Sequence, residues 1–154
     1  MKSIIIYATK YGNTKAIAES IGSCLGNAIL CDIGETPLPD VSDYECVVLG
    51  SPLTAGSIRK EMKTFVQQHS GEMKGKRLGL FLSGLQGSEG YWKRNFSEDL
   101  LSAATVKAFV GGTFDPEKCG LLARKVIKLV AKLDCYTSTI DHDKIKLFAQ
   151  ELAI

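Results

Sequence analysis

A short polar loop near the start of the chain carries residue types that can bind an anion. The loop spans Thr9 to Thr14, with the sequence TKYGNT, and it lies between an apolar run and a helical pattern. A helix start offers unpaired N–H groups and the positive end of the helix dipole, both of which suit a phosphate. Thr9 and Thr14 can add hydroxyl donors, and Gly12 lets the backbone approach a ligand closely. Asn13 can cap the helix. The loop therefore predicts a phosphate site or, alternatively, an ordinary N-cap loop without a ligand, where Ser, Thr and Asn are favoured.

A second loop, Gly50 to Ser57, has the sequence GSPLTAGS and follows an apolar run. It is long for a connection between a strand and a helix. A planar ring can lie against Leu53 and the peptides around Thr54–Gly56. The alternative is an ordinary turn into a helix that Ser57 caps.

A third loop, Ser83 to Trp92, has the sequence SGLQGSEGYW, with three glycines in seven residues. The glycines leave backbone N–H and C=O groups free to meet the edge of a heteroaromatic ring. Tyr91 or Trp92 can pack on the face of such a ring. The alternative places Trp92 in the hydrophobic core.

Other chemistries have no support in the sequence. There is no G-x-x-x-x-G-K-[ST] P-loop, and the missing G-x-G-x-x-G fingerprint counts against a dinucleotide. No cysteine pair has C-x-x-C spacing, and His69 and His142 are isolated, so we predict no metal site. No residue is assigned as a general acid or base.

Apolar runs alternate with helical patterns along the chain. Runs without polar alternation indicate strands that are covered on both faces, which is typical of a parallel sheet. The predicted strands are Ser3–Ala8, Ala28–Ile33, Cys46–Gly50, Arg77–Leu82 and Val106–Gly111. The predicted helices between them are Thr14–Leu25, Ile58–His69 and the less regular Glu89–Leu101. The section Gly34–Glu45 contains two prolines and predicts little or no helix. This alternation predicts an α/β fold, in which ligands bind at the carboxyl ends of the strands.

The C-terminal quarter predicts two more helices. The first, Leu121–Leu133, is basic and amphipathic, with the polar residues Arg124, Lys125, Lys128 and Lys132. Its apolar face contains Leu122, Val126, Leu129, Val130 and Leu133. We expect this helix to cover the domain, although such a helix can also lie on an acidic membrane surface or a partner. The second helix begins at Asp141 or His142 and ends near Leu152.

Composition sets the broad class of the protein. Of the 154 residues, 45% are hydrophobic and 23% are charged, which fits one globular domain over residues 1–154. The formal charge of +2 gives no argument for nucleic acid or a membrane. The five cysteines lack a disulfide pattern, and no apolar run has the length of a membrane span or signal peptide. We therefore expect a cytoplasmic protein with reduced cysteines and no nucleic-acid partner.

The ordered set of three loops resembles the flavodoxins over nearly the whole chain, strand spacing included. The shared motifs are T-x-x-G-N-T after the first strand, SDYECVVLGSP leading into the second loop, and the glycine-rich third loop. The resemblance implies a three-layer fold, with helices on both faces of a five-stranded parallel sheet of order 2-1-3-4-5, and a bound FMN.

The resemblance also implies a role for each loop. The residues expected to hold the FMN phosphate are Thr9, Lys10, Tyr11, Gly12, Asn13 and Thr14. Those expected on one side of the flavin ring are Ser51, Pro52, Leu53, Thr54, Ala55 and Gly56. Those expected on the other side are Ser83, Gly84, Leu85, Gln86 and Gly87, with Tyr91 or Trp92 available for stacking.

The chain departs from the flavodoxins in three respects. Many flavodoxins have an aromatic residue where this chain has Ala55, and threonine is frequent where it has Tyr11. Flavodoxins are typically strongly acidic, and this chain is not, which implies a different redox partner.

The C-terminal quarter is similar to that of the flavodoxin-like, menaquinone-dependent protoporphyrinogen oxidases. The shared features are a GG pair closing the fifth strand, the basic and apolar helix, and a D-x-x-T…D run. Those enzymes carry a long basic insertion near strand four, where this chain has only SGLQGSEGYWKRNF. The resemblances imply an FMN-binding electron-transfer protein. One alternative is an FMN-dependent oxidoreductase of the protoporphyrinogen oxidase type, and another is an FMN-free regulatory or binding domain. The partner would be a redox protein or a small redox substrate, such as a quinone or porphyrinogen.

Overall fold

A parallel β-sheet forms the centre of the computed structural model, which describes residues 1–35, 37–130, 132–133 and 135–154. The strands of this sheet are β1 (Ser3–Tyr7), β2 (Ile29–Asp32), β3 (Cys46–Pro52), β4 (Arg77–Ser83) and β5 (Val106–Phe109). Their order is β2-β1-β3-β4-β5, and each neighbouring pair is parallel. The predicted α/β fold with sheet order 2-1-3-4-5 is therefore confirmed.

Strand β1 lies between β2 and β3 and is buried on both faces, as its apolar run Ile4–Ile6 predicts. Successive side chains of a strand point to opposite faces of the sheet. Ile4 and Ile6 accordingly belong to one hydrophobic cluster, while Ile5 and Tyr7 belong to the other. A strand with a core on each side favours apolar residues at both sets of positions, which explains why Ile4, Ile5 and Ile6 show no polar alternation.

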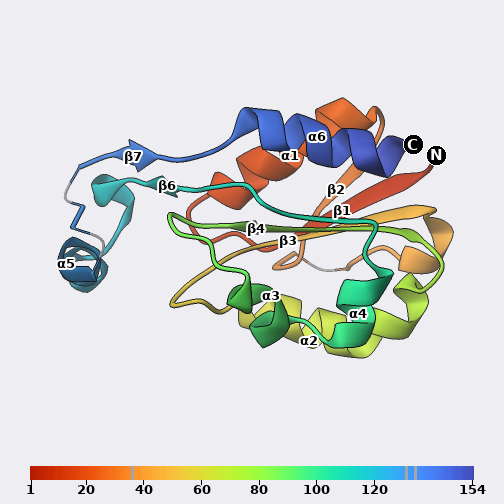
Figure 1. Cartoon of the computed structure of the whole chain (residues 1–154), viewed down its shortest axis with the longest axis horizontal. Helices are drawn as coiled ribbons and strands as arrows, with labels where there is room; N and C mark the ends of the chain where they lie inside the picture. The colour runs from red at the N-terminus through yellow and green to blue at the C-terminus, as the bar shows by residue number, and fades with distance from the viewer. Residues whose placement is uncertain (36, 131, 134) are drawn as a thin grey trace.

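Helices cover both faces of the sheet (Figure 1). On one face lie α1 (Asn13–Leu25) and α6 (His142–Ala153). On the other lie α2 (Lys60–His69), α3 (Gly90–Asn95) and α4 (Glu98–Ala103), with the short 3-10 helix η2 (Ser70–Met73) after α2. The first pair buries Ile21 and Phe148 in one cluster, and the second group buries Met62, Trp92 and Leu100 in the other.

The segment predicted as one helix over Glu89–Leu101 forms two helices instead. The Ser97 hydroxyl accepts a hydrogen bond from the Leu100 N–H at 3.2 Å, and this cap starts α4 two residues after α3 ends. Glu98 and Asp99 follow the cap, and their negative charges suit the first turn of a helix.

The connection between β2 and β3 has little helix, as its prolines predict. Among its described residues only the 3-10 helix η1 (Val41–Asp43) forms, and Thr36 lies outside those residues. The Asp40 carboxylate accepts a hydrogen bond from the Ser42 N–H at 2.9 Å. This bond holds the pKa of Asp40 below its ordinary value, because it favours the charged form.

After β5 the chain leaves the sheet and forms a small antiparallel pair, β6 (Thr113–Phe114) with β7 (Thr137–Ser138). Between these strands lie the 3-10 helix η3 (Pro116–Lys118) and α5 (Leu121–Val130), which projects beyond the sheet at the left of Figure 1. The expectation that this helix covers the domain is wrong. Helix α5 projects beyond the sheet, and α1 and α6 cover the sheet face on their side. The position of α6 agrees with the second predicted C-terminal helix, whereas Ala131, in the predicted first one, lies outside the described residues.

The described residues contain no helix long and apolar enough to cross a lipid bilayer. All five cysteines lie within the described ranges, and each is a free thiol. Cys46 is buried in β3, and desolvation raises the pKa of its thiol. The described residues also contain no group of His, Cys, Asp and Glu side chains placed to hold a metal ion.

Candidate functional site

The three predicted loops meet at the carboxyl ends of β1, β3 and β4, and hydrogen bonds join them in pairs. The Ala8 N–H donates to the Gly50 carbonyl at 2.9 Å, which joins the ends of β1 and β3. The Leu53 N–H donates to the Ser83 carbonyl at 2.8 Å, which joins the second loop to the third. The hydroxyls of Thr14 and Ser83 lie 3.0 Å apart in a buried hydrogen bond. The structure thus brings the three loops into one site.

The first loop presents the start of α1 without a side-chain cap among the described residues. The residue before the helix is Gly12, in the left-handed region with φ of 90°. The first helical bond runs from the Ala16 N–H to the Gly12 carbonyl at 3.1 Å. The N–H groups of residues 13 to 15 therefore have no carbonyl one turn earlier in the helix. A β-carbon at Gly12 would meet nothing within 4 Å, so there is open space beside the helix start. This arrangement fits a phosphate.

Asn13 does not cap the helix, so the prediction of a cap from Asn13 is wrong. Its side-chain amide donates a hydrogen bond to the Thr113 carbonyl at 3.0 Å, and it ties the first loop to β6. The Thr9 hydroxyl accepts from the Gly12 N–H at 3.0 Å and shapes the loop. Lys10 is exposed, with its ammonium 5.2 Å from the centre of the Tyr11 ring. The first loop thus carries an exposed cation, whose charge favours the binding of an anion.

Thr14 and Ser83 are buried and pair with each other. Thr14 is 1% exposed and Ser83 is 2% exposed, and their hydroxyls bond to each other. A paired hydroxyl at this depth fixes the start of α1 against the end of β4. These two residues therefore position the first and third loops relative to each other.

The second loop contains a tight turn at Thr54–Ser57. Thr54 and Ser57 each donate an N–H to the other's carbonyl, at 2.9 and 3.0 Å. The two central residues, Ala55 and Gly56, have positive φ angles of 50° and 76°, as in a type I′ turn. Ser57 does not cap α2, which begins at Lys60. The buried Ser51 hydroxyl instead accepts from the Arg59 N–H at 3.0 Å.

Asn95, at the end of α3, holds the second loop in place. Its side-chain oxygen accepts from the Ile58 N–H at 3.0 Å. Its amide group donates to the Gly56 carbonyl at 2.9 Å and to the Tyr91 carbonyl at 2.8 Å. No sequence pattern predicts this role, because a lone asparagine at a helix end gives no information about contacts 39 residues away in the chain.

Replacing Asn95 with alanine is expected to lower the free energy of unfolding by about 2 kcal/mol, because partly buried backbone groups lose their partners. Urea denaturation measures this effect. Asn27→Ala, at an exposed asparagine, is the matched control and should change the stability by less than about 0.5 kcal/mol. Equal urea midpoints for the two variants would contradict the role of Asn95.

The third loop lies against the end of β5. The Gly84 N–H donates to the Gly111 carbonyl at 2.9 Å, and a β-carbon at Gly87 would come within 2.5 Å of the Phe109 ring. Leu85 is half-buried and Gln86 is exposed. The Phe109 ring thus packs against this loop. The apolar sequence around Phe109 predicts only ordinary core packing and does not indicate this role.

The two aromatic candidates of the third loop lie in different places. Trp92 is 5% exposed and stacks on Phe96, with ring centroids 6.1 Å apart, so it belongs to the core, as the alternative interpretation states. Tyr91 is half-buried and lies beside the second loop, since a β-carbon at Gly56 would be 2.7 Å from Tyr91 Cε1. Of the two rings, only Tyr91 has an exposed part at this edge.

Basic side chains surround the first and second loops. An open hollow between the loops is lined by Lys10, Thr54, Ser57, Ile58, Arg59, Lys60 and Glu61. Glu61 is the acidic member of this set, and its carboxylate lies 3.6 Å from Arg59 Nε. Arg94 Nη1 would lie 2.8 Å from a β-carbon at Gly56. The potential at this edge therefore favours negatively charged ligands and partners.

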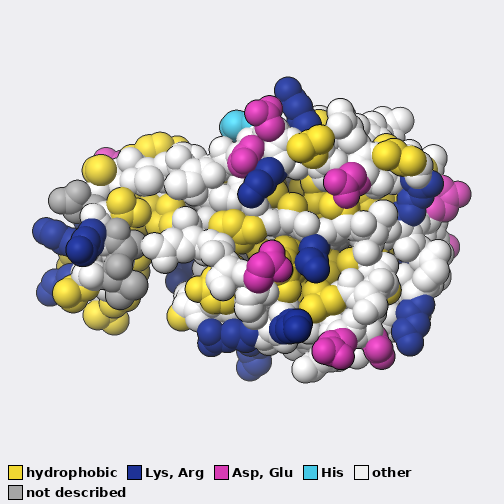
Figure 2. All heavy atoms as spheres, in the orientation of Figure 1, with side chains coloured by type: hydrophobic (Ala, Val, Ile, Leu, Met, Phe, Trp, Pro, Cys, Tyr) yellow, Lys and Arg dark blue, Asp and Glu magenta, His cyan; other side chains and the backbone are white. Residues whose placement is uncertain are grey.

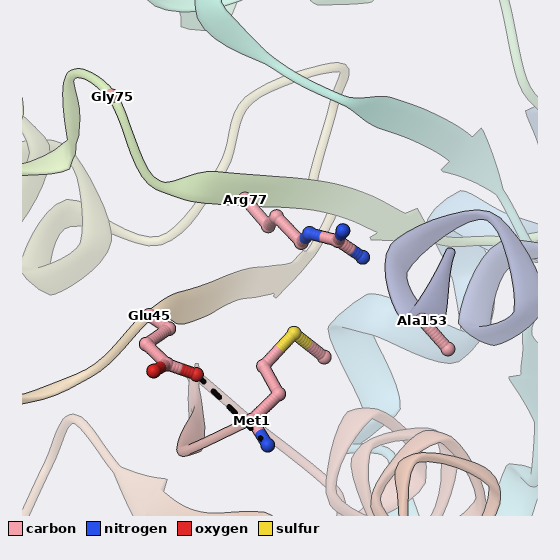
Figure 3. Close-up of a pocket in the computed structure, with 5 residues that line it drawn as sticks. All are labelled: Met1, Glu45, Gly75, Arg77 and Ala153. Atoms are coloured by element: carbon pink, nitrogen blue, oxygen red, sulfur yellow. Dashed lines mark ion pairs between the residues drawn. The ribbon is translucent and has the colours of Figure 1, made fainter.

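A second hollow lies at the opposite edge of the sheet, where β3 and β4 begin (Figure 3). Met1, Glu45, Gly75, Arg77 and Ala153 line it. The amino group of Met1 lies 3.9 Å from the Glu45 carboxylate, and Arg77 donates to the Leu152 carbonyl at 2.8 Å. The charged groups here pair with each other or with a backbone carbonyl. This hollow is therefore a structural junction between β3, β4 and α6.

Known structures share this architecture at low sequence identity. The two-electron reduced flavodoxin of Megasphaera elsdenii is 18% identical, with a TM-score of 0.64 and 98% of each chain covered. A flavodoxin from the domain Archaea is 17% identical, with a TM-score of 0.61, covering 99% of this chain and 96% of that one. A flavoprotein of Lactobacillus acidophilus NCFM, solved in complex with FMN, is 18% identical. Its TM-score is 0.55, and the match covers 72% of this chain and 91% of that one.

No curated protein matches the sequence. Residues 4–141 match the protein family described as "Flavodoxin domain". This range includes the three loops and all of the parallel sheet except Ser3, and it is most of the chain. The protein therefore belongs to the flavodoxin-domain family.

Proposed function

We propose that the chain binds FMN without a covalent link and transfers electrons through it. Membership of the flavodoxin-domain family supports FMN as the cofactor. The observation that carries the proposal is the uncapped start of α1, held beside two turns by the hydrogen bonds of Ser83. When bound, FMN supplies the redox chemistry, and the protein binds and orients it.

Each loop has its own part in this proposal. The backbone N–H groups of residues 13 to 15 and the Thr9 hydroxyl hold the phosphate. The turn at Thr54–Ser57 lies on one side of the flavin ring, and residues 84 to 87 lie on the other. Tyr91 closes the edge near Gly56. Trp92 supports the third loop from the core and does not touch the ring.

The redox partner is proposed to present an acidic surface. Lys10, Arg59 and Lys60 are grouped beside the second loop, and opposite charges across an interface raise the rate of encounter. Electron transfer to such a partner should therefore slow as the salt concentration rises.

Titration of the purified protein with FMN tests the proposal. Binding should quench the fluorescence of FMN, and the complex should be yellow and take up electrons during anaerobic reduction. A protein that stays colourless and leaves FMN fluorescence unchanged would overturn the proposal. That result would favour the FMN-free regulatory or binding domain.

A second candidate is an FMN-dependent oxidoreductase of the protoporphyrinogen oxidase type, acting on a porphyrinogen or a quinone. The exposed apolar side chains of α5 favour it, since they lie at the same end of the sheet as the three loops (Figure 1). Turnover of protoporphyrinogen IX with a menaquinone analogue is the test. If the FMN-loaded protein gives no turnover, this candidate is removed and the electron-transfer proposal stands.

A further inference from the structure

Helix α5 projects from the protein and exposes apolar side chains. Leu121, Leu122 and Leu129 are 75%, 78% and 80% exposed, and Val126 is 50% exposed. A short connection through β6 and β7 joins the helix to the rest of the chain (Figure 1). Figure 2 shows apolar and basic side chains together on this projecting part. Large apolar residues this exposed and this close together mark a contact surface.

The exposed apolar residues form one stripe along the helix. Leu122, Val126 and Leu129 are spaced by four and three residues, so they lie on the same side. The opposite flank contains Ala123, Arg124 and Ile127, which are half-buried. The two sides of the helix therefore differ in exposure, and the apolar stripe is on the more exposed side.

The charge of α5 has one sign. Arg124, Lys125 and Lys128 lie within Leu121–Val130, and this range contains no acidic residue. Lys125 and Lys128 are exposed and lie on one side of the apolar stripe, Lys125 next to it and Lys128 farther round the helix. Apolar side chains bordered by lysines match the boundary between the acyl chains and the headgroups of an anionic bilayer.

A second copy of the chain fits this surface less well. A stable dimer interface buries about 800 Å² on each partner, and a helix about 15 Å long with three stripe residues offers much less. Two α5 helices in contact would also bring lysines of like charge together. A lipid surface has neither restriction, because it accepts a small apolar face and attracts every lysine.

We propose that α5 docks the protein on the surface of an anionic lipid bilayer. The stripe of Leu122, Val126 and Leu129 inserts at the headgroup boundary, and Lys125 and Lys128 contact the phosphates. This inference does not depend on FMN, since docking uses only the side chains of α5. The two proposals can therefore fail separately.

Cosedimentation with lipid vesicles tests the docking. The full-length protein should bind vesicles of phosphatidylcholine mixed with phosphatidylglycerol, and binding should fall with added salt. It should bind vesicles of pure phosphatidylcholine far less. A protein that stays in the supernatant with the anionic vesicles at low salt would overturn the proposal.

Matched variants assign the binding to α5. The double variant Lys125→Gln with Lys128→Gln should bind about 25-fold more weakly, at about fivefold for each lysine removed. Leu122→Ser with Leu129→Ser should abolish binding. The controls are on α6, where Leu147 is 57% exposed and Lys144 and Lys146 are exposed. Leu147→Ser and the double variant Lys144→Gln with Lys146→Gln should bind like the parent protein.

Two outcomes of these measurements contradict docking by α5. In the first, the α5 and α6 variants lose vesicle binding equally, which would assign the effect to net charge. In the second, sedimentation velocity without lipid shows a dimer that the Leu122→Ser and Leu129→Ser changes dissociate, which would assign the stripe to self-association. FMN titration of every variant checks that the candidate site is intact.

Discussion

Replacing Gly12 with aspartate is expected to weaken FMN binding about a hundredfold while the protein stays folded. The new carboxylate would stand at the uncapped start of α1, beside the N–H groups proposed to hold the phosphate. Two negative charges a few ångströms apart near a protein surface repel by about 3 to 4 kcal/mol, which corresponds to a factor of at least one hundred. The space around this position is open, so the side chain has room.

The matched control is Gly26→Asp, at the other end of the same helix. Gly26 also has φ of 90°, and a β-carbon there would meet nothing within 4 Å. The ψ angles differ, at −5° for Gly12 and −122° for Gly26, so backbone strain is greater in Gly26→Asp. The FMN affinities are therefore compared on protein that circular dichroism shows to be folded, where the difference between the variants reports the charge at the site. Titration by fluorescence quenching should give the parent affinity for Gly26→Asp. Riboflavin, which lacks the phosphate, should show a much smaller difference between the variants. Equal FMN affinities for both variants would place the phosphate elsewhere.

Replacing Gly111 with alanine is expected to lower the free energy of unfolding by about 3 kcal/mol. Gly111 has φ of 81°, which strains any residue with a side chain. A β-carbon there would also lie 1.9 Å from the Thr139 carbonyl oxygen, so the backbone has to move. The neighbouring bonds, from the Thr139 N–H to Gly112 and from the Asp141 N–H to Val110, hold the segment before α6 against the sheet.

Urea denaturation of Gly111→Ala and of Gly71→Ala measures this difference. A β-carbon at Gly71 would meet nothing within 4 Å, so alanine there should change the stability by less than about 0.5 kcal/mol. Matching urea midpoints would show that the junction between β5 and α6 relaxes without cost. Gly111→Ala should also weaken FMN binding, because the Gly111 carbonyl accepts from Gly84 in the third loop.

The strands were predictable because burial on both faces leaves a simple signature in the sequence. Ile4, Ile5 and Ile6 form a continuous apolar run, and the structure places them in cores on both sides of the sheet. The order of the strands came from the resemblance to flavodoxins. Apolar runs show that strands exist, but they carry no information about which strand is the neighbour of which.

The place of a helix in the fold was less predictable than its place in the sequence. The pattern of Leu121–Leu133 shows that two sides of a helix differ, and it does not show what contacts the apolar side. This helix was expected to cover the domain, but α6 covers the sheet instead, with Phe148 and Leu152 buried against the strands. The break between α3 and α4, by contrast, had a readable signal in Ser97 followed by two acidic residues.

The site was predicted at the level of loops, and the roles of single residues depended on contacts far apart in sequence. Asn13 is a residue type that often caps helices, but its side-chain amide donates a hydrogen bond to the Thr113 carbonyl, 100 residues away. Asn95 and Phe109 support the second and third loops from outside them. No local pattern marks such residues, because their partners come together only when the sheet forms.

Ser83, the last residue of β4, fixes the positions of the site loops relative to the sheet. Its carbonyl fixes the second loop, and its hydroxyl fixes the start of α1. A site held in this way is preorganised, and its loops need little rearrangement before a ligand binds. Association should then be governed by diffusion to the open edge of the sheet, and differences in affinity among variants should appear mainly in the dissociation rate.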